Sequence, residues 1–209
     1  MPKMAQKEYH ARIPETMSDV AALVEQARAG SRTAFEQIVG MFQGDIFRMA
    51  YYRTHSSMDA EDLTQEIFMQ AFKNLSRLKT AERFRSWLFK IALNRVRDFN
   101  RKKRFRALFS TLDDSDKVDR SYGETRDHPD ALDSLMVKDF WKQIGLFIDK
   151  LSRMEREVFM LRFMDHLSIK EISQVLRKSE STIKTHLYRS IQKFKREHSI
   201  RQLLQEETA

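Results

Sequence analysis

Apolar side chains recur at three- and four-residue steps along most of this chain, the spacing that places them on one face of a helix. The pattern predicts a short helix from Ser18, as its cap, to just before Gly30, and a second over residues 31–54. Stripes over residues 59–75 and 84–104 predict a third and a fourth. We expect the inner residues of these two to be Leu63, Ile67, Phe68, Ala71, Phe72 and Leu75, then Phe84, Trp87, Leu88, Ile91, Ala92, Val96 and Phe99.

The helical pattern stops near residue 110, where acidic residues dominate and Gly123 and Pro129 occur. We predict a flexible linker over residues 110–132, because its few apolar side chains cannot offset the entropy of ordering it. A calcium loop fits poorly, since Val118 occupies a ligand position and Asp119 the position that requires glycine. The apolar stripe then resumes with Leu132, Leu135, Met136, Phe140, Ile144, Phe147 and Leu151.

Two candidate capping boxes divide the remaining chain into short helices. Ser152 with Glu155 and Ser168 with Glu171 predict helices over residues 155–163 and 169–176. A longer last helix follows over residues 180–198, after a three-residue turn. Its inner face is expected to be Ile183, Leu187, Ile191 and Phe194.

The positions of glycine and proline favour an all-α fold. None of the five glycines and three prolines lies between Gly44 and Gly123, and none follows Gly145. Helix formers without breakers favour helix over strand. We therefore expect two small helical domains, residues 18–109 and 133–200, joined by the flexible acidic linker 110–132. Residues 1–17 form a tail without an interpretable pattern, and residues 201–209 form a second tail.

Composition narrows the classes of function. The chain has 209 residues, a formal charge of +8 and no cysteine, which excludes disulfides, cysteine zinc sites and a thiol nucleophile. No apolar run is long enough for a membrane span, and the mixed charges of residues 1–17 do not resemble a signal peptide. We therefore expect neither secretion nor membrane insertion.

The last two helices fit a helix-turn-helix, whose second helix lies in the DNA major groove. The outward face of residues 180–198 would carry no acid, and residues 177–201 hold eight Lys and Arg against two Glu. Such an excess attracts phosphate. An ordinary solvated basic helix is the alternative. The outward side chains are Ser181, Lys184, Thr185, Tyr188, Arg189, Gln192 and Lys193.

A second basic region covers residues 83–106, with ten Lys and Arg against the single acid Asp98. Aromatic residues are interleaved with this charge, as in proteins that stack unpaired bases beside a basic groove. For Phe84, Trp87 and Phe99 core packing is the stronger interpretation. Three other rings are less constrained and could stack on bases: Phe89, Phe105 and Phe109.

The polar face of the helix over residues 59–75 forms an acidic patch in a basic protein, made of Asp59, Asp62, Gln65, Glu66 and Met69. A basic protein partner is one interpretation, and a solvated face is the other. A carboxylate metal site is disfavoured, because this helix holds no histidine for a Glu-x-x-His motif.

Two segments of the N-terminal half, residues 59–68 (DAEDLTQEIF) and 84–94 (FRSWLFKIALN), resemble the extracytoplasmic-function sigma factors, the smallest sigma-70-type initiation factors of bacteria. Residues 156–163 (REVFMLRF) and 167–173 (LSIKEIS) are similar to the promoter-binding domain of that family. Family members usually place Gly where Arg177 stands and an apolar residue where Lys178 stands. A left-handed Arg177 would be strained by roughly 1 kcal/mol.

The resemblance implies a role for each patch. The acidic patch would bind the clamp coiled coil of the large subunit of core RNA polymerase, and the flap region would be a further contact. Residues 76–83 would take an unstacked base of the −10 element, beside the contacts Arg83, Arg85, Asn94, Arg97, Arg101 and Lys102. The last helix would read the −35 element with Ser181, Lys184, Thr185, Tyr188, Arg189 and Lys193.

The resemblance further implies promoter DNA as a partner, a cytoplasmic protein, and an anti-sigma factor that could hold it at the membrane. We expect no cofactor, metal or small-molecule substrate. A simple helix-turn-helix regulator is the rival, but it would leave the N-terminal half unexplained. An enzyme is the weakest alternative, since the six histidines are dispersed and no nucleophile or phosphate-loop motif occurs.

Overall fold

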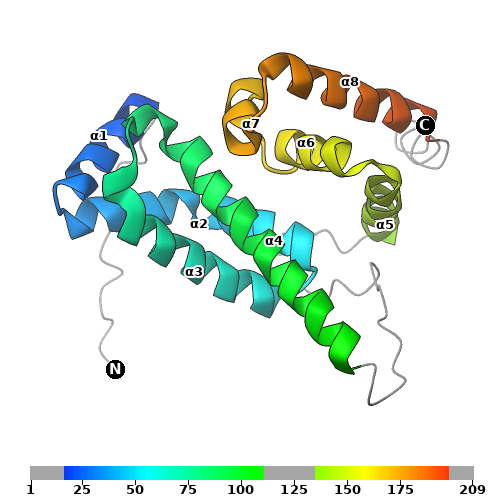
Figure 1. Cartoon of the computed structure of the whole chain (residues 1–209), viewed down its shortest axis with the longest axis horizontal. Helices are drawn as coiled ribbons and strands as arrows, with labels where there is room; N and C mark the ends of the chain where they lie inside the picture. The colour runs from blue at the N-terminus through cyan, green and yellow to red at the C-terminus, as the bar shows by residue number, and fades with distance from the viewer. Residues whose placement is uncertain (1–16, 111–134, 198–209) are drawn as a thin grey trace, which may run out of the picture.

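Helices make up all the regular structure of residues 17–110 and 135–197, which the computed structural model describes, with side chains for 19–107 and 141–197 (Figure 1). The all-α prediction is therefore confirmed. Residues 111–132 of the expected linker, residues 1–16 of the first tail and the whole tail 201–209 lie outside the described residues. So do the side chains of Leu132, Leu135, Met136 and Phe140. The elements are α1 (Met17–Arg28), α2 (Arg32–Thr54), α3 (Ser57–Asn74), η1 (Leu75–Arg77), η2 (Ala81–Arg83), α4 (Phe84–Ser110), α5 (Leu135–Lys150), α6 (Arg153–Phe163), α7 (Ile169–Leu176) and α8 (Glu180–Arg196).

Side-chain caps determine where several helices begin. The hydroxyl of Ser56 accepts a hydrogen bond from the backbone N–H of Asp59 at 3.2 Å, so α3 begins at Ser57, two residues before the expected start. Both capping boxes of the C-terminal half are present. The expected cap of α1 is wrong, because Met17 already lies in the helix and Ser18 follows it. The fourth helix continues to Ser110 rather than ending near residue 104.

The N-terminal domain, α1 to α4, packs around a core of fully buried side chains, among them Val24, Ile38, Ile46, Met49, Ile67, Phe84 and Leu88. The apolar stripes therefore predict its core well. Phe72 is the exception, because half of this side chain is exposed. Its ring touches Phe35 edge-on at 4.9 Å, so it lies at the rim of the core.

The C-terminal domain, α5 to α8, has a second cluster of buried residues: Ile144, Phe147, Leu151 and Phe159. Phe194 of α8 closes it, with its ring 5.3 Å from that of Phe147. This contact attaches the end of α8 to α5, whereas α7 packs across the beginning of α8, as a helix-turn-helix requires.

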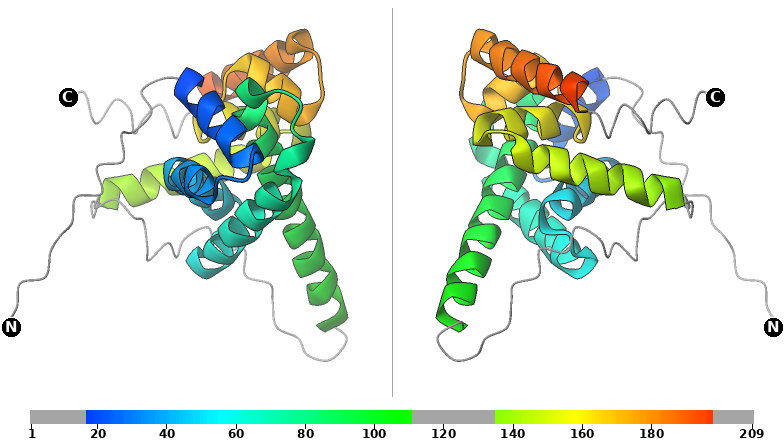
Figure 2. Two further views of the ribbon diagram at one scale, coloured as in Figure 1. Left: turned by 90° about the vertical axis from the view of Figure 1, so that its left-hand side faces the viewer. Right: turned by 90° about the vertical axis from the view of Figure 1, so that its right-hand side faces the viewer.

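The two domains pack against each other through α4 and α7, which lie side by side in Figure 1. The buried residues Leu161, Leu167, Ile172 and Val175 of the C-terminal domain join the core of the N-terminal domain in one continuous cluster. The basic end of α4 instead projects beyond the other helices (Figure 2).

This packing gives α4 a second buried stripe and overturns the expectation that Phe89 is available to stack on bases. Phe89 is fully buried, and the guanidinium of Arg85, which contacts α7, lies 5.3 Å from its ring centroid.

Among the described helices, none is long and apolar enough to cross a membrane.

Candidate functional site

The outer face of α8 is a polar, basic surface. Ser181, Lys184, Thr185, Tyr188 and Arg189 are all exposed there, with Tyr188 65% exposed. Ile183 on the opposite face is fully buried, so the helix cannot rotate to hide these groups. Hydroxyl, ammonium and guanidinium donors on one exposed helix can contact base edges and phosphates. The structure thus brings together five of the six residues expected to contact the −35 element.

Lys193, the sixth, has a structural contact. Its ammonium lies 2.6 Å from a carboxylate oxygen of Glu155, a residue that is only 5% exposed. The same carboxylate accepts the backbone N–H of Ser152 at 3.0 Å and so caps α6. Burial raises the pKa of Glu155, but the hydrogen bonds from Lys193 and Ser152 outweigh it and lower the pKa to about 2. Lys193 therefore connects α8 to the start of α6.

The turn between α7 and α8 departs from the common glycine turn. Arg177 adopts the left-handed conformation, with φ 52° and ψ 48°, a geometry that costs an L-residue roughly 1 kcal/mol. The backbone N–H of Lys178 donates to the carbonyl of Ser173 at 3.1 Å and ends α7.

The side chain of Arg177 also acts on α4. Burial, and secondly the charge of Arg177, lower the pKa of Lys90 on that helix.

The expected −10 contacts divide into two groups. Arg83, Asn94, Arg101 and Lys102 are exposed, and the Arg101 side chain is 75% exposed although it pairs with Asp98 at 3.1 Å. Arg85 and Arg97 are instead half-buried against the C-terminal domain. Arg85 pairs with Glu171 of α7 at 3.0 Å, and Arg97 pairs with Glu157 of α6 at 3.1 Å.

The aromatic rings near this surface are mostly not available to bases. Phe84 is fully buried, while Trp87 and Phe99 pack at the edge of the core, which confirms the core interpretation for all three. Phe105 is 61% exposed on the projecting end of α4. The side chain of Phe109 lies outside the described residues.

The acidic patch on α3 separates into two surfaces. Asp62, Gln65 and Met69 are exposed on the outer side, with Met69 58% exposed. Met58, which the sequence pattern did not single out, is 71% exposed and lies on the same side. The spacing of residues 58, 62, 65, 69 and 72, three or four apart, is the signal that could have revealed this stripe.

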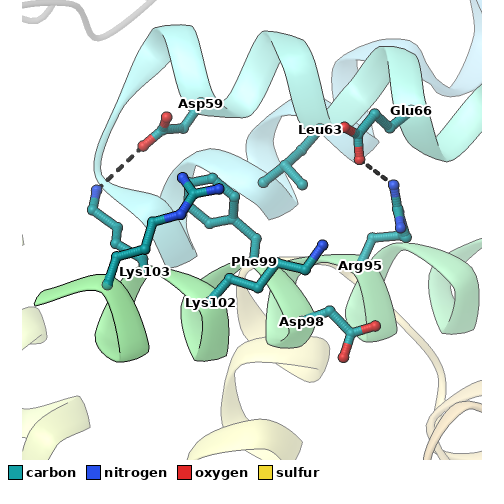
Figure 3. A pocket seen from close by; sticks show the side chains of 9 residues that line it. Asp59, Leu63, Glu66, Arg95, Asp98, Phe99, Lys102 and Lys103 are labelled. Carbon is teal, nitrogen blue, oxygen red and sulfur yellow. Dashed lines mark hydrogen bonds and ion pairs between the residues drawn. The ribbon is translucent and has the colours of Figure 1, made fainter. Parts of the chain in front are cut away.

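Asp59 and Glu66 instead turn toward α4, where they line an open pocket of about 410 Å³ between the two helices (Figure 3). Asp59 pairs with Lys103 at 3.3 Å, and Glu66 pairs with Arg95. These exposed pairs hold α3 against α4, and each contributes little to stability. The outer surface therefore keeps Asp62 as a carboxylate for which no ion pair is found within the described residues.

Within the described ranges, no group of three or more His, Asp or Glu side chains could hold a metal ion. The exposed surfaces are two basic ones, on α8 and α4, and one of mixed acidic and apolar character, on α3. They lie on separate helices, so each can bind a different partner.

Family models match both halves of the chain. Residues 38–106 match Sigma-70 region 2, and residues 141–194 match Sigma-70 region 4. The ECF RNA polymerase sigma factor BldN of Streptomyces coelicolor is 33% identical over 186 residues, which cover 86% of this chain and 67% of BldN.

Two solved structures share the fold. One is CnrH, a protein of Cupriavidus metallidurans, in complex with the cytosolic domain of CnrY, with a TM-score of 0.61, 23% identity, and coverage of 83% of this chain and 93% of CnrH. The other is the sigma factor RpoE with the anti-sigma factor NepR from Bartonella quintana, with a TM-score of 0.58, 22% identity, and coverage of 82% of this chain and 96% of RpoE. The two matched regions and the identity with BldN together show that the chain belongs to the extracytoplasmic-function group of sigma-70-type RNA polymerase sigma factors.

Proposed function

We propose that this chain binds core RNA polymerase, directs it to promoters with defined −10 and −35 elements, and promotes melting of the DNA. The observation that carries the proposal is the division of three exposed surfaces among α3, α4 and α8. A regulator that only bound an operator would need α8 alone.

The outer face of α3 is the proposed polymerase site. Asp62 and Gln65 lie between the exposed methionines Met58 and Met69, so polar contacts would be flanked by apolar area. This combination suits a basic partner helix, such as one helix of the clamp coiled coil, because charge gives orientation and the methionines supply adaptable packing. Asp59 and Glu66, which pair with α4, would play a smaller part. The flap region of the polymerase is the proposed contact of the C-terminal domain.

The two DNA elements would be bound in different forms. The outer face of α8 would read the −35 element as a duplex, whereas α4 with residues 76–83 would hold the −10 element as a single strand. A protein that binds the open strand more tightly than the duplex shifts the equilibrium toward melting, and stacking contributes about 1 to 3 kcal/mol per base. No nucleotide hydrolysis is needed, so we propose a factor without enzymatic activity or cofactor.

An anti-sigma factor is the further proposed partner, supported by the fold shared with RpoE, which was solved with the anti-sigma factor NepR. We place the protein in the cytoplasm, where core polymerase and DNA are found. A membrane-bound anti-sigma factor would hold it at the membrane until release.

Run-off transcription tests the proposal. Purified chain and core polymerase free of other sigma factors are incubated with fragments of the genome that encodes the chain. We expect discrete transcripts, which a variant with Asp62→Arg and Gln65→Ala loses. Gln70→Ala, an exposed substitution elsewhere on α3, is the matched control.

The opposite result is equally informative. DNA binding without transcripts, and without co-elution with core polymerase, would refute the initiation factor and favour a helix-turn-helix regulator.

A further inference from the structure

The sulfur atoms of this chain are all in methionine, because it has eleven methionines and no cysteine. Met58 and Met69, both on α3, are 71% and 58% exposed. Every other methionine whose side chain the structure describes is buried or half-buried, and Met49 is fully enclosed in the core. Susceptibility to oxidation follows exposure to the dissolved oxidant. Of the described sulfur atoms, the two on α3 are therefore the ones that such an oxidant reaches most readily.

The two exposed methionines share one face of α3. They are eleven residues apart, close to three helical turns, so they lie on the same side of the helix and about 16 Å apart along its axis. Ile67, fully buried on the opposite side, fixes that orientation. Asp62 and Gln65 lie between them. Met58 and Met69 are therefore at the two ends of the surface proposed to bind core polymerase.

The helices that carry the two basic surfaces contain no methionine. Neither α4 nor α8 has one in its sequence. Oxidation that alters the outer face of α3 therefore leaves the side chains of the basic surfaces unchanged. Met49 and Met160 are sheltered, at 0% and 7% exposed, so the cores are oxidised more slowly than the exposed pair. Mild oxidation thus acts on polymerase binding separately from DNA binding.

Conversion of methionine to its sulfoxide changes an apolar side chain into a polar one. With hydrogen peroxide, the thioether sulfur attacks one peroxide oxygen, so that an S–O bond forms and the O–O bond breaks. The departing hydroxide takes up the proton left on the transferred oxygen and leaves as water. The sulfur loses two electrons and the peroxide gains them. The product carries an acceptor oxygen in place of apolar contact area, and burial of that oxygen without a donor is unfavourable.

We propose that Met58 and Met69 are oxidation sites through which a peroxide weakens the binding of this chain to core RNA polymerase. This rests on the proposed function, which makes the outer face of α3 the polymerase site. Methionine suits an interface because its flexible, polarisable side chain adapts to a partner, and the sulfoxide loses that advantage. The charge of Asp62 is unchanged, so the oxidised face keeps its electrostatic orientation and loses apolar packing.

The modification is reversible. A methionine sulfoxide reductase returns the sulfoxide to methionine, while a dithiol is oxidised to a disulfide and the sulfoxide oxygen leaves as water. Binding to polymerase would therefore recover when the oxidant is removed and a dithiol reductant is present.

Peptide mapping and an equilibrium binding assay test the proposal on the full chain. The chain alone is treated with hydrogen peroxide, and catalase removes the peroxide before core polymerase is added, so that the polymerase is not oxidised. Mass spectrometry measures the oxidised fraction of each methionine. Biolayer interferometry with immobilised core polymerase measures the Kd, and fluorescence anisotropy with a short duplex measures DNA binding. Circular dichroism checks the fold.

Three double variants locate the effect. Met58→Leu with Met69→Leu removes both exposed sulfur atoms and keeps apolar side chains of similar volume. Met41→Leu with Met154→Leu, at half-buried sites of α2 and α6, is the matched control. Each of these chains is compared with itself before and after peroxide, so an effect of the substitutions on the starting affinity cancels. Met58→Gln with Met69→Gln introduces polar side chains at the same two positions without peroxide.

We expect Met58 and Met69 to be oxidised before Met49 and Met160. Peroxide should then raise the Kd for core polymerase by about tenfold or more in the parent and in the matched control, and by less than about twofold in the leucine variant. The glutamine variant should bind core polymerase about tenfold more weakly than the parent. Binding of duplex DNA should change less than about twofold in every chain. A sulfoxide reductase with dithiothreitol should restore the affinity of the oxidised parent.

Two results would overturn the proposal. One is an unchanged Kd of the parent once Met58 and Met69 are both sulfoxides. The other is an equal loss of affinity in the leucine variant, which would assign the effect to other methionines.

A failure of the proposed function gives a different result. If Asp62→Arg with Gln65→Ala keeps full affinity for core polymerase, the outer face of α3 is not the polymerase site and both proposals fail. If that variant loses affinity and the oxidised parent does not, only the oxidation proposal is refuted.

Discussion

Glu155 combines two stabilising contacts that can be removed by one substitution. Its carboxylate caps α6 through the N–H of Ser152 and pairs with Lys193 of α8 at 2.6 Å. Glu155→Gln keeps the size of the side chain and an oxygen for the cap, but it removes the negative charge. The variant therefore isolates what the charge contributes to the C-terminal domain.

The pKa of Glu155 sets the magnitude. At about 1.36 kcal/mol per unit, a pKa lowered from 4.5 to about 2 corresponds to about 3 kcal/mol of folding free energy at neutral pH. The Lys193 side chain is 47% exposed, so water and salt weaken the pair. We expect Glu155→Gln to lower the free energy of unfolding by about 2 kcal/mol at pH 7.

The pH dependence follows from the direction of the shift. Because folding lowers the pKa of this carboxyl, its contribution is complete above about pH 4.5 and is lost as the pH falls toward 2. The difference between parent and variant should therefore shrink through that interval. Urea unfolding monitored by circular dichroism between pH 7 and pH 3 measures it.

A double-mutant cycle with Lys193→Met assigns the effect to the pair. Glu36→Gln, at an exposed site on α2, serves as the control. A difference between parent and Glu155→Gln that is absent at pH 7, or that stays constant down to pH 3, would refute the reasoning.

The remaining predictions concern the turn, the core and the DNA surface. Arg177→Gly should raise the free energy of unfolding by up to about 1 kcal/mol in urea titrations, because glycine adopts the left-handed conformation without strain; a lower value would contradict it. Phe89→Ala should cost about 3 to 5 kcal/mol by the same assay, since the side chain is fully buried; a loss under about 1 kcal/mol would mean that the ring is not in the core. Lys184→Ala and Arg189→Ala should each weaken binding of a −35 duplex, which fluorescence anisotropy at several salt concentrations measures. The slope of log affinity against log salt concentration should fall by about one for each phosphate that is no longer neutralised. An unchanged slope would mean that the side chain does not bind a phosphate.

The local sequence determined which segments are helices and which side chains form each domain's own core. Ser31 and Ser56 cap helices, and both capping boxes form, because these interactions involve residues only three apart. The apolar stripes predicted most of the buried residues of α3 and of the first half of α4, with Phe72 and Phe89 as the exceptions, because the period of a helix follows from its backbone. The outer face of α8 was predictable for the same reason.

Contacts between distant segments were decided by the tertiary structure. Phe89 is buried and Arg85 is paired because α7 packs on a side of α4 that the main stripe leaves polar. Asp59 and Glu66 turn toward α4 while Asp62 faces outward, since the docking of α3 selects among positions that periodicity alone groups together. The Arg53–Asp165 pair joins residues 112 positions apart. Helical spacing reports only the geometry within one helix, so which polar groups of two domains meet is settled only when the domains pack.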